Sequence, residues 1–331
     1  MTATESKYFL KRAGDILQQL DDAGQLKQLQ MIESPMGPTI MIRDRGEVDC
    51  FCSNNYLGLA NHPDVVAAGI EGLRKYGAGT ASVRFICGTF APHEALEQRI
   101  ASFLAVEAAY TFVSCWNAVE ALFPTICDDG DVIVSDELNH ACIIDSMRLT
   151  TSIKRGVSKL IYKHSDMSSL RDALQKANEK RAENGVVFVV TDGVFSMEGD
   201  IAKLQEIRSI CNEYSAMLVV DDSHGTGVMG KTGRGTHEYC GMEGDDIDIY
   251  CGTFGKALGG GAGGYIAGRR ETIDLIVQRA RPTLFSNALP VTVACSAKAA
   301  IDTLDHHPEL VQKLRDNVVY ARKGIGEVGY E

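Results

Sequence analysis

Short apolar runs alternate with stretches of helical spacing through the middle of the chain, and this alternation restricts the fold more than any other feature of the sequence. The apolar runs lie at residues 108–113, 132–135, 160–162, 186–191, 217–221 and 247–250. Helical spacing is found at residues 63–76, 92–104, 117–126, 167–181 and 204–214. Most runs are continuously apolar, as is typical of strands that are buried on both faces of a sheet. The sequence therefore predicts an α/β fold whose mainly parallel sheet is covered by helices on both faces.

The two ends of the chain differ from this middle part. Residues 4–30 are polar with apolar residues at helical spacing, and we expect an N-terminal arm over residues 1–45. After a break near Pro282 the chain is helical from about residue 290, and no later run could form a second sheet. We therefore expect a large domain over residues 46–286. Residues 287–331 would then begin a small C-terminal domain that is cut short.

Composition and charge argue against several classes of partner. The formal net charge is −11, whereas a nucleic acid or an anionic membrane calls for a basic protein face. No apolar run approaches the roughly 20 residues that a membrane-spanning helix needs. The 10 cysteines are scattered without paired Cys-x-x-Cys motifs, which indicates free thiols in a reducing compartment and no metal site. The first residues lack a signal-peptide pattern, so we expect the cytoplasm, or the mitochondrial matrix if a presequence has been removed.

One lysine stands where a reactive amine would be placed. Lys256 follows the apolar run 247–250 and precedes a glycine-rich stretch at residues 259–264, and Thr253 lies just before it. A lysine that forms a Schiff base needs its amine held at one point, with room for a ring beside it. Thr253 offers a hydroxyl of the kind that holds a phosphate. A flexible glycine-rich loop with a solvated lysine explains the same stretch equally well.

Polar side chains follow two other predicted strands, at the edge where ligands bind in open α/β sheets. Asp221 ends the run 217–221, and His224 follows shortly after. A carboxylate in this position is suited to bond a pyridine nitrogen and keep it protonated, and His224 could reach a phenolate oxygen of the same ring. Ser196 follows the run 186–191 near the same edge. Taken singly, a surface Asp-Asp turn and a hydroxyl that satisfies a turn are the more common explanations.

Two predicted helix starts add further candidates. Cys115 and Trp116 lie where the run 108–113 passes into a helix, and a helix N-terminus is suited to bind phosphate. His140 follows the run 132–135 at another helix start, where its imidazole could stack on an aromatic cofactor or protonate an oxygen. Packing is the more common role of such a tryptophan, and capping that of such a histidine. The order of these features along the chain is more specific than any one of them.

This order resembles that of the α-oxoamine synthases, fold-type-I pyridoxal-phosphate enzymes that join an amino acid to an acyl-CoA. The resemblance extends from about residue 5 to the end and is strongest to the glycine C-acetyltransferase branch. The segments that carry it are 53–59 (SNNYLGL), 82–89 (SVRFICGT), 135–145, 191–197, 221–224 (DDSH), 233–238 (GRGTHE), 252–260 and 281–289. It implies an aminotransferase-like fold and pyridoxal 5'-phosphate as the cofactor.

The resemblance implies a role for each residue around the cofactor ring. Lys256 would bind the cofactor as a Schiff base, and Asp221 would pair with the pyridine nitrogen. Ser196 and His224 would hold the phenolate oxygen. His140 would stack on the ring.

The same resemblance implies which residues bind the phosphate, which one binds the substrate and which one reaches a partner subunit. Cys115 and Trp116 would hold the phosphate through their main-chain amides, and Thr253 would add its hydroxyl. Asn54 matches a residue that binds the amino-acid substrate. Ser286 matches a residue that reaches the phosphate of a partner subunit, which implies a homodimer.

The implied reaction condenses glycine with acetyl-CoA to 2-amino-3-oxobutanoate and CoA, and its reverse serves threonine catabolism. Sphingoid-base, 5-aminolevulinate and 8-amino-7-oxononanoate synthesis are the alternatives within the family. Close relatives have Asp-Ala-Asn-Gly where this chain has residues 117–120 (NAVE). The family's arginine for the substrate carboxylate belongs to the part of the C-terminal domain beyond Glu331. We therefore expect cofactor binding with poor condensation, and a pyridoxal-phosphate-binding protein without turnover is the alternative from another functional class.

Overall fold

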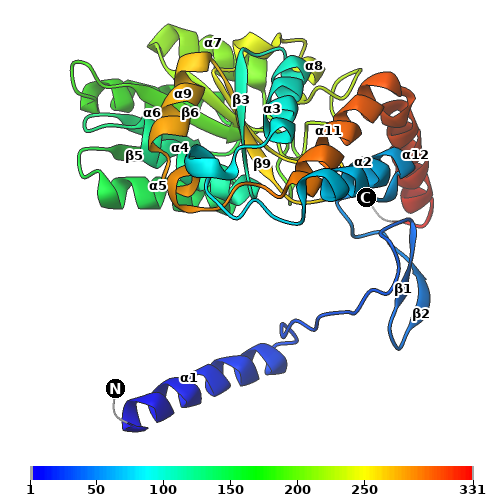
Figure 1. Ribbon diagram of the computed structural model, residues 1–331. Coiled ribbons are helices and arrows are strands. Elements are labelled where there is room, and N and C mark those ends of the chain that lie inside the picture. Colours follow the sequence, from blue (N-terminus) through cyan, green and yellow to red (C-terminus); the bar gives the residue numbers. More distant parts are fainter. Residues whose placement is uncertain (1–2, 330–331) are drawn as a thin grey trace. The chain divides into compact units, whose positions relative to one another are not determined.

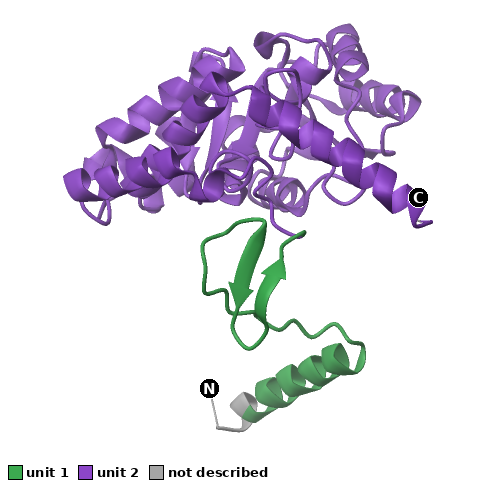
Figure 2. Ribbon diagram, turned by 90° about the vertical axis from the view of Figure 1, so that its right-hand side faces the viewer, with its two compact units in different colours: residues 1–51 green, residues 52–331 purple. Residues whose placement is uncertain are grey.

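The computed structural model describes residues 3–329 and divides the chain into two compact units, one up to Phe51 and the other from Cys52 onward (Figure 2). The first unit contains helix α1 (Ala3–Asp22) and an antiparallel hairpin of β1 (Thr39–Ile42) and β2 (Gly46–Asp49). The helix lies where helical spacing predicted one. The hairpin was not predicted, because its strands are short and mostly exposed.

The second unit is built on a seven-stranded sheet within the described residues. Its strands are β3 (Ala108–Phe112), β4 (Val132–Asp136), β5 (Ser158–Tyr162), β6 (Val187–Asp192), β7 (Met217–Asp221), β8 (Ile249–Thr253) and β9 (Gly264–Gly268). The strand order is β3-β9-β8-β7-β6-β4-β5. The neighbours from β8 to β5 pair in parallel, and β9 is antiparallel to both β3 and β8. The mainly parallel sheet is therefore confirmed, with one antiparallel strand that the sequence did not reveal.

Helices cover the two faces of this sheet. Their bounds are α2 (Pro63–Tyr76), α3 (Ala91–Leu104), α4 (Cys115–Ile126), α5 (Ala141–Ile153), α6 (Met167–Lys180), α7 (Leu204–Tyr214), α8 (Thr236–Tyr239), α9 (Arg270–Arg279), α10 (Arg281–Phe285), α11 (Val291–His306) and α12 (Glu309–Glu327). Short 3₁₀ turns lie at Leu59–Asn61 and Gly244–Asp246, and a π-helical turn lies at Arg84–Gly88. Figure 1 labels most of these elements.

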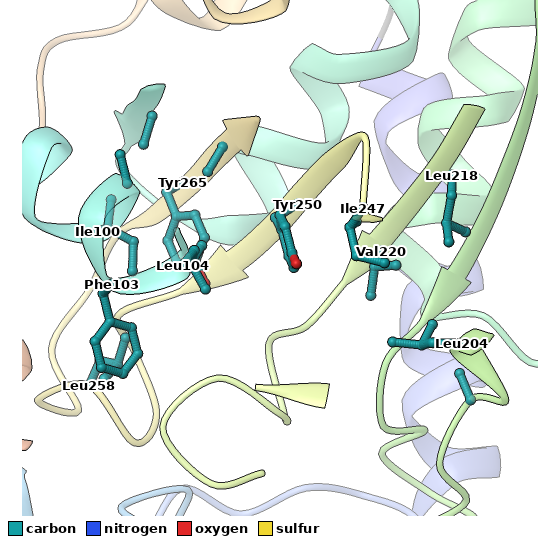
Figure 3. Packing of buried hydrophobic residues seen from close by; sticks show 14 of the residues in the cluster. Ile100, Phe103, Leu104, Leu204, Leu218, Val220, Ile247, Tyr250, Leu258 and Tyr265 are labelled. Atoms are coloured by element: carbon teal, nitrogen blue, oxygen red, sulfur yellow. The ribbon is translucent and has the colours of Figure 1, made fainter. Parts of the chain in front are cut away.

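Alternate residues of each strand divide the core into two layers. Val189, Leu218 and Tyr250 pack with helices α3, α6, α7 and α11 on one face. Their chain neighbours Val190 and Val219 pack with helices α4, α5 and α9 on the other. Figure 3 shows part of the first layer, where Tyr250 and Tyr265 of the sheet lie near α3. Because both faces of the inner strands are buried, these strands are mostly apolar at consecutive positions, whereas the edge strand β5 alternates between partly buried and exposed residues.

The parallel arrangement brings the ends of several strands to one edge. Register pairs Asp192 with Asp221, Asp221 with Cys251, and Thr253 with Gly264. Helix α11 packs against α2 and α3. That residues 287–331 begin a separate small domain stays a prediction.

Candidate active site

A cavity of about 200 Å³ lies at the carboxyl ends of the parallel strands. Seven of the predicted site residues line it: Cys115, Trp116, His140, Asp221, His224, Thr253 and Lys256. The structure adds Cys142, Asp192, Val194 and Ser223 to the lining. Residues separated by more than 140 positions in the sequence, such as Cys115 and Lys256, therefore meet in one place.

Lys256 begins a chain of hydrogen bonds that leaves the cavity. Its Nζ lies 2.7 Å from Nε2 of His224, and Nδ1 of the same ring lies 2.9 Å from the hydroxyl of Tyr56. The Tyr56 hydroxyl donates to Oδ1 of Asn54 at 3.0 Å. Since Tyr56 donates to Asn54, its oxygen accepts from His224 Nδ1–H, which leaves Nε2 to accept from Lys256. The network thus selects the Nδ1–H tautomer of His224.

Burial lowers the pKa of both nitrogen bases of this pair. Partial burial lowers the pKa of Lys256, and this effect outweighs the opposing influence of Asp221. Burial, reinforced by the charge of Lys256, lowers the pKa of His224 to about 4. A neutral amine is the form that attacks a carbonyl or removes a proton.

The turn that carries Lys256 is fixed by its backbone and by one hydroxyl. Thr253 donates from Oγ1 to the carbonyl of Gly263 at 3.1 Å and accepts from the Gly255 amide at 3.0 Å. Gly264 is the register partner of Thr253, and a Cβ at Gly264 would lie 2.3 Å from the amide nitrogen of Cys115. Only glycine lets β9 approach the start of α4 this closely. Thr253 and the N-terminus of α4 are thereby held close to each other, on either side of Gly264.

Two adjacent carboxylates at the end of β7 have different surroundings. Asp221 lines the cavity, and its Oδ1 accepts from the Ser223 amide at 3.0 Å. Asp222 is fully buried and points away, into a loop that it holds through the hydroxyl of Thr226 and the amide and hydroxyl of Thr236. Burial raises the pKa of Asp222 to about 6 despite these hydrogen bonds. The geometry therefore makes Asp221 the carboxylate available to a ligand.

Two thiols face the second oxygen of Asp221. Sγ of Cys115 and Sγ of Cys142 lie 3.9 Å and 3.8 Å from its Oδ2. Burial first, and the charge of Asp221 second, raise the pKa of both thiols, so each keeps its proton. The Cys115 thiol can donate to the carboxylate, whereas Sγ of Cys142 also lies 2.9 Å from Nδ1 of His140, which is a nearer acceptor.

His140 stands at the start of α5, where its ring nitrogen Nδ1 accepts from the Cys142 amide at 3.2 Å. Its ring meets the ring of Trp116 edge to face, with centroids 6.3 Å apart. Because Nδ1 accepts, the proton of a neutral His140 sits on Nε2. The predicted capping role is present, and the same ring borders the cavity.

Three predicted residues do not line the cavity. Asn54 is exposed and takes part only through its bond from Tyr56. Ser196 is exposed, in the segment after β6. Ser286 is half-buried and borders a different hollow together with Arg281 and Phe285.

Four contributors were not identified from the sequence: Tyr56, Cys142, Asp192 and Ser223. Asp192 ends β6 as Asp221 ends β7, so the rule that found the one carboxylate could have found the other. Tyr56 and Cys142 carry no such signal, because their part in the site depends on tertiary contacts.

No group of His, Cys, Asp and Glu side chains suited to a metal ion occurs among residues 3–329. Over the same residues, no helix combines the length and apolarity that crossing a bilayer requires.

The fold is that of a helix-covered, mainly parallel α/β sheet, and the site combines a lysine, a buried carboxylate and a helix N-terminus at the carboxyl ends of its strands. Residues 49–331 match the aminotransferase class I and II family. The chain belongs to this family.

Comparison with individual proteins narrows the class. A 2-amino-3-ketobutyrate coenzyme A ligase from Salmonella typhimurium is 43% identical over 323 residues, which cover 97% of this chain and 79% of the relative. An 8-amino-7-oxononanoate synthase from Thermoanaerobacter pseudethanolicus is 44% identical over 315 residues, or 95% and 77% of the two chains. A serine palmitoyltransferase structure from S. paucimobilis, with a bound PLP–myriocin aldimine, superposes with a TM-score of 0.86 at 29% identity, covering 98% and 79%. The resemblance to α-oxoamine synthases is confirmed, and pyridoxal phosphate is the cofactor of these enzymes.

The residues of the cavity fit this cofactor. Lys256 offers a primary amine of lowered pKa, and the buried carboxylate of Asp221 can balance a protonated pyridine nitrogen. The first amides of α4, at Cys115 and Trp116, have no helical carbonyl to bond and suit a phosphate.

Proposed function

We propose that this chain condenses glycine with acetyl-CoA to form 2-amino-3-oxobutanoate and CoA, and that it cleaves the ketoacid in reverse. The observation that carries the proposal is the short contact between Lys256 and His224 in a cavity that also holds the Asp221 carboxylate. Relatives named 2-amino-3-ketobutyrate coenzyme A ligase support the choice of substrates.

When bound, pyridoxal phosphate supplies an electron sink that makes the Cα proton of an attached amino acid acidic. Lys256 would remove this proton and return it, and its lowered pKa favours the neutral amine that can accept a proton. Asp221 would hold the pyridine nitrogen protonated, with two thiols close to its Oδ2. His140 would present Nε2–H to the oxygen of the thioester carbonyl as negative charge develops there.

Other residues would hold the cofactor in place. The amides of Cys115 and Trp116 would bind the phosphate. The hydroxyl of Thr253 would join them by turning its proton from the Gly263 carbonyl to a phosphate oxygen. Ser196 and His224 would bind the phenolate oxygen. For His224 this requires the ring proton to move from Nδ1 to Nε2, the nitrogen that accepts from Lys256 in this structure. The surroundings of His224 and Thr253 support their roles, because both line the cavity. Ser196 does not line it, and its role stays a prediction.

We further propose a homodimer in which Ser286 serves the phosphate of the neighbouring site. Ser286 lies outside the cavity of its own chain, beside Phe285, whose side chain is 80% exposed. An aromatic side chain with this exposure at the end of a short helix gains free energy if a second copy covers it.

The second candidate is 8-amino-7-oxononanoate synthesis, which the relative from Thermoanaerobacter pseudethanolicus favours at equal identity. The name describes a product with a two-carbon amine unit attached to a seven-carbon acyl chain that ends in a carboxylate. Alanine and a seven-carbon dicarboxylic acyl-CoA would yield it, with release of CO2 from the alanine carboxylate and of free CoA from the thioester. The two candidates therefore differ in both substrates.

Release of free CoA from purified protein loaded with pyridoxal phosphate tests the proposal. We expect slow turnover with glycine and acetyl-CoA, in line with the poor condensation expected from the sequence, and still less with alanine and pimeloyl-CoA. The reverse ranking would favour the second candidate. Absorbance that responds to glycine without CoA release would indicate a binding protein without turnover.

A further inference from the structure

Asp192 occupies a place in the cavity that the proposed chemistry leaves unused. It ends β6, its side chain is 6% exposed, and it pairs in register with Asp221 on the adjacent parallel strand. Two buried carboxyls thus lie side by side at the edge of the sheet. Such a costly arrangement calls for a reason in the hydrogen bonds that Asp192 makes.

Those hydrogen bonds lead to His140. Oδ2 of Asp192 accepts from the main-chain amide of His140 at 3.0 Å. The amide of Asp192 donates to Oδ1 of Asn139 at 2.8 Å, so the two segments are tied in both directions. Nδ2 of Asn139 in turn donates to Val190 O at 2.9 Å and to Ser135 Oγ at 2.8 Å.

We propose that Asp192 is a positioning residue. Its carboxyl group accepts a hydrogen bond from the main-chain amide of His140 and thereby fixes the turn that presents the His140 ring to the cavity. This inference rests on the proposed function only for its effect on rate, since the contact itself exists without cofactor or substrate. His140 begins α5, so its ring direction follows from where its main chain enters the helix. The bond from the Cys142 amide to Nδ1 then sets the orientation of the ring.

The charges around Asp192 favour a neutral acceptor there. Burial first, and the charge of Asp221 second, raise the pKa of Asp192 to about 8, while the His140 amide and Lys256 oppose this. Asp136 on β4 adds to the increase. The raised pKa favours the uncharged acid, which can accept from the His140 amide without a full charge beside Asp221. Asparagine is a close neutral substitute for it.

The test compares Asp192→Asn, which keeps an acceptor oxygen, with Asp192→Ala, which removes it. Asp131→Ala is the matched control, since Asp131 is equally buried and accepts two main-chain hydrogen bonds, from Asp128 and Val186, at the opposite end of β4. If Asp192→Ala does not fold, Asp192→Ser replaces it, because the serine side chain is too short to reach the His140 amide.

Trp116 provides a readout that needs neither cofactor nor substrate, because it is the only tryptophan and touches the His140 ring. We expect the emission of Trp116 to change in Asp192→Ala and to match the unchanged protein in Asp192→Asn and in Asp131→Ala. Unchanged emission in Asp192→Ala would overturn the proposal. So would equal changes in the Asn and Ala variants, because charge rather than the acceptor would then be responsible.

The holoenzyme supplies the second readout. We expect kcat to fall by about ten- to a hundredfold in Asp192→Ala, since a misplaced proton donor loses part of its contribution, and to stay within about twofold in Asp192→Asn. Adding Asp192→Ala to His140→Ala should cost nothing further, because both act through one ring. Additive losses would overturn the proposal. If neither variant affects turnover while the emission changes, the proposed role of His140 fails and the positioning contact stands.

Discussion

The segments that follow β7 and β8 each deliver one base to the cavity, yet they are held by different means. The segment after β7 carries His224, and a buried charge at Asp222 anchors it to Thr226 and Thr236. The segment after β8 carries Lys256 and is shaped by glycines and by the hydroxyl of Thr253. The first is rigid because a network of polar side chains fixes it. The second is shaped by its backbone, which leaves the lysine surrounded by little side-chain bulk.

The largest expected effect follows from removing the base on the second segment. Lys256→Ala should abolish covalent attachment of pyridoxal phosphate under borohydride reduction and lower CoA release by at least about a thousandfold. Lys231→Ala, on the exposed part of the first segment, serves as the control and should attach cofactor normally. Covalent attachment that persists without Lys256 would show that another amine serves the site.

Variants of the two adjacent carboxylates on the first segment should differ in effect, one lowering the rate of the reaction and the other the stability of the fold. Asp221→Asn should slow exchange of the glycine Cα proton by roughly a hundredfold, because the electron sink loses its charged partner. Asp222→Asn should instead destabilise the fold by about 2 kcal/mol, since an amide cannot accept all the hydrogen bonds that the carboxylate accepts. Thermal unfolding and proton exchange, measured on both variants, check this. Equal loss of exchange in the two variants would mean that Asp221 is the wrong carboxylate.

The backbone-shaped segment has one side chain whose loss should loosen it. Thr253→Val keeps the volume but removes the bonds to Gly263 and Gly255, and we expect pyridoxal phosphate to bind about tenfold more weakly, or roughly 1.4 kcal/mol. Thr253→Ser retains the hydroxyl and should bind the cofactor almost normally. Fluorescence titration with the cofactor measures both. Equal affinity of the valine variant would show that the glycines suffice.

The difference between the two segments also explains what the sequence could reveal. Asp221, His224 and Lys256 follow apolar runs directly, and the ends of parallel strands share an edge, so their meeting was predictable. Strand β9 was not predicted, because glycines at both of its ends, Gly264 and Gly268, concealed a short buried strand.

Contacts across the fold carried no comparable signal. Tyr56 lies 168 residues from His224 in the chain, and nothing near either residue announces their hydrogen bond. Cys142 reaches Asp221 only because α5 packs on the sheet beside α4. Such partners depend on how helices pack, which local patterns do not encode.

The smallest expected effect concerns a third segment, the one that follows β6. This segment is tied to the end of β4 by a histidine. His164 links Asp136, at the end of β4, to Asp200 of this segment, with both ring nitrogens 3.0 Å from a carboxylate oxygen. Partial burial acts to lower the pKa of His164, but the hydrogen bonds with Asp136 and Asp200 outweigh it, so the pKa is raised.

A raised pKa in the folded state means that His164 stabilises the fold fully below its ordinary pKa of about 6.5, and that this contribution is lost as pH rises through the folded value. His164→Gln should therefore destabilise the protein at pH 5.5 by less than about 1 kcal/mol and have a smaller effect at pH 8.5. Unfolding midpoints in urea at the two pH values measure the difference, with His306→Gln at an exposed helix end as the control. A larger effect at pH 8.5 than at pH 5.5 would mean that the neutral ring, and not its charge, holds the segment to β4.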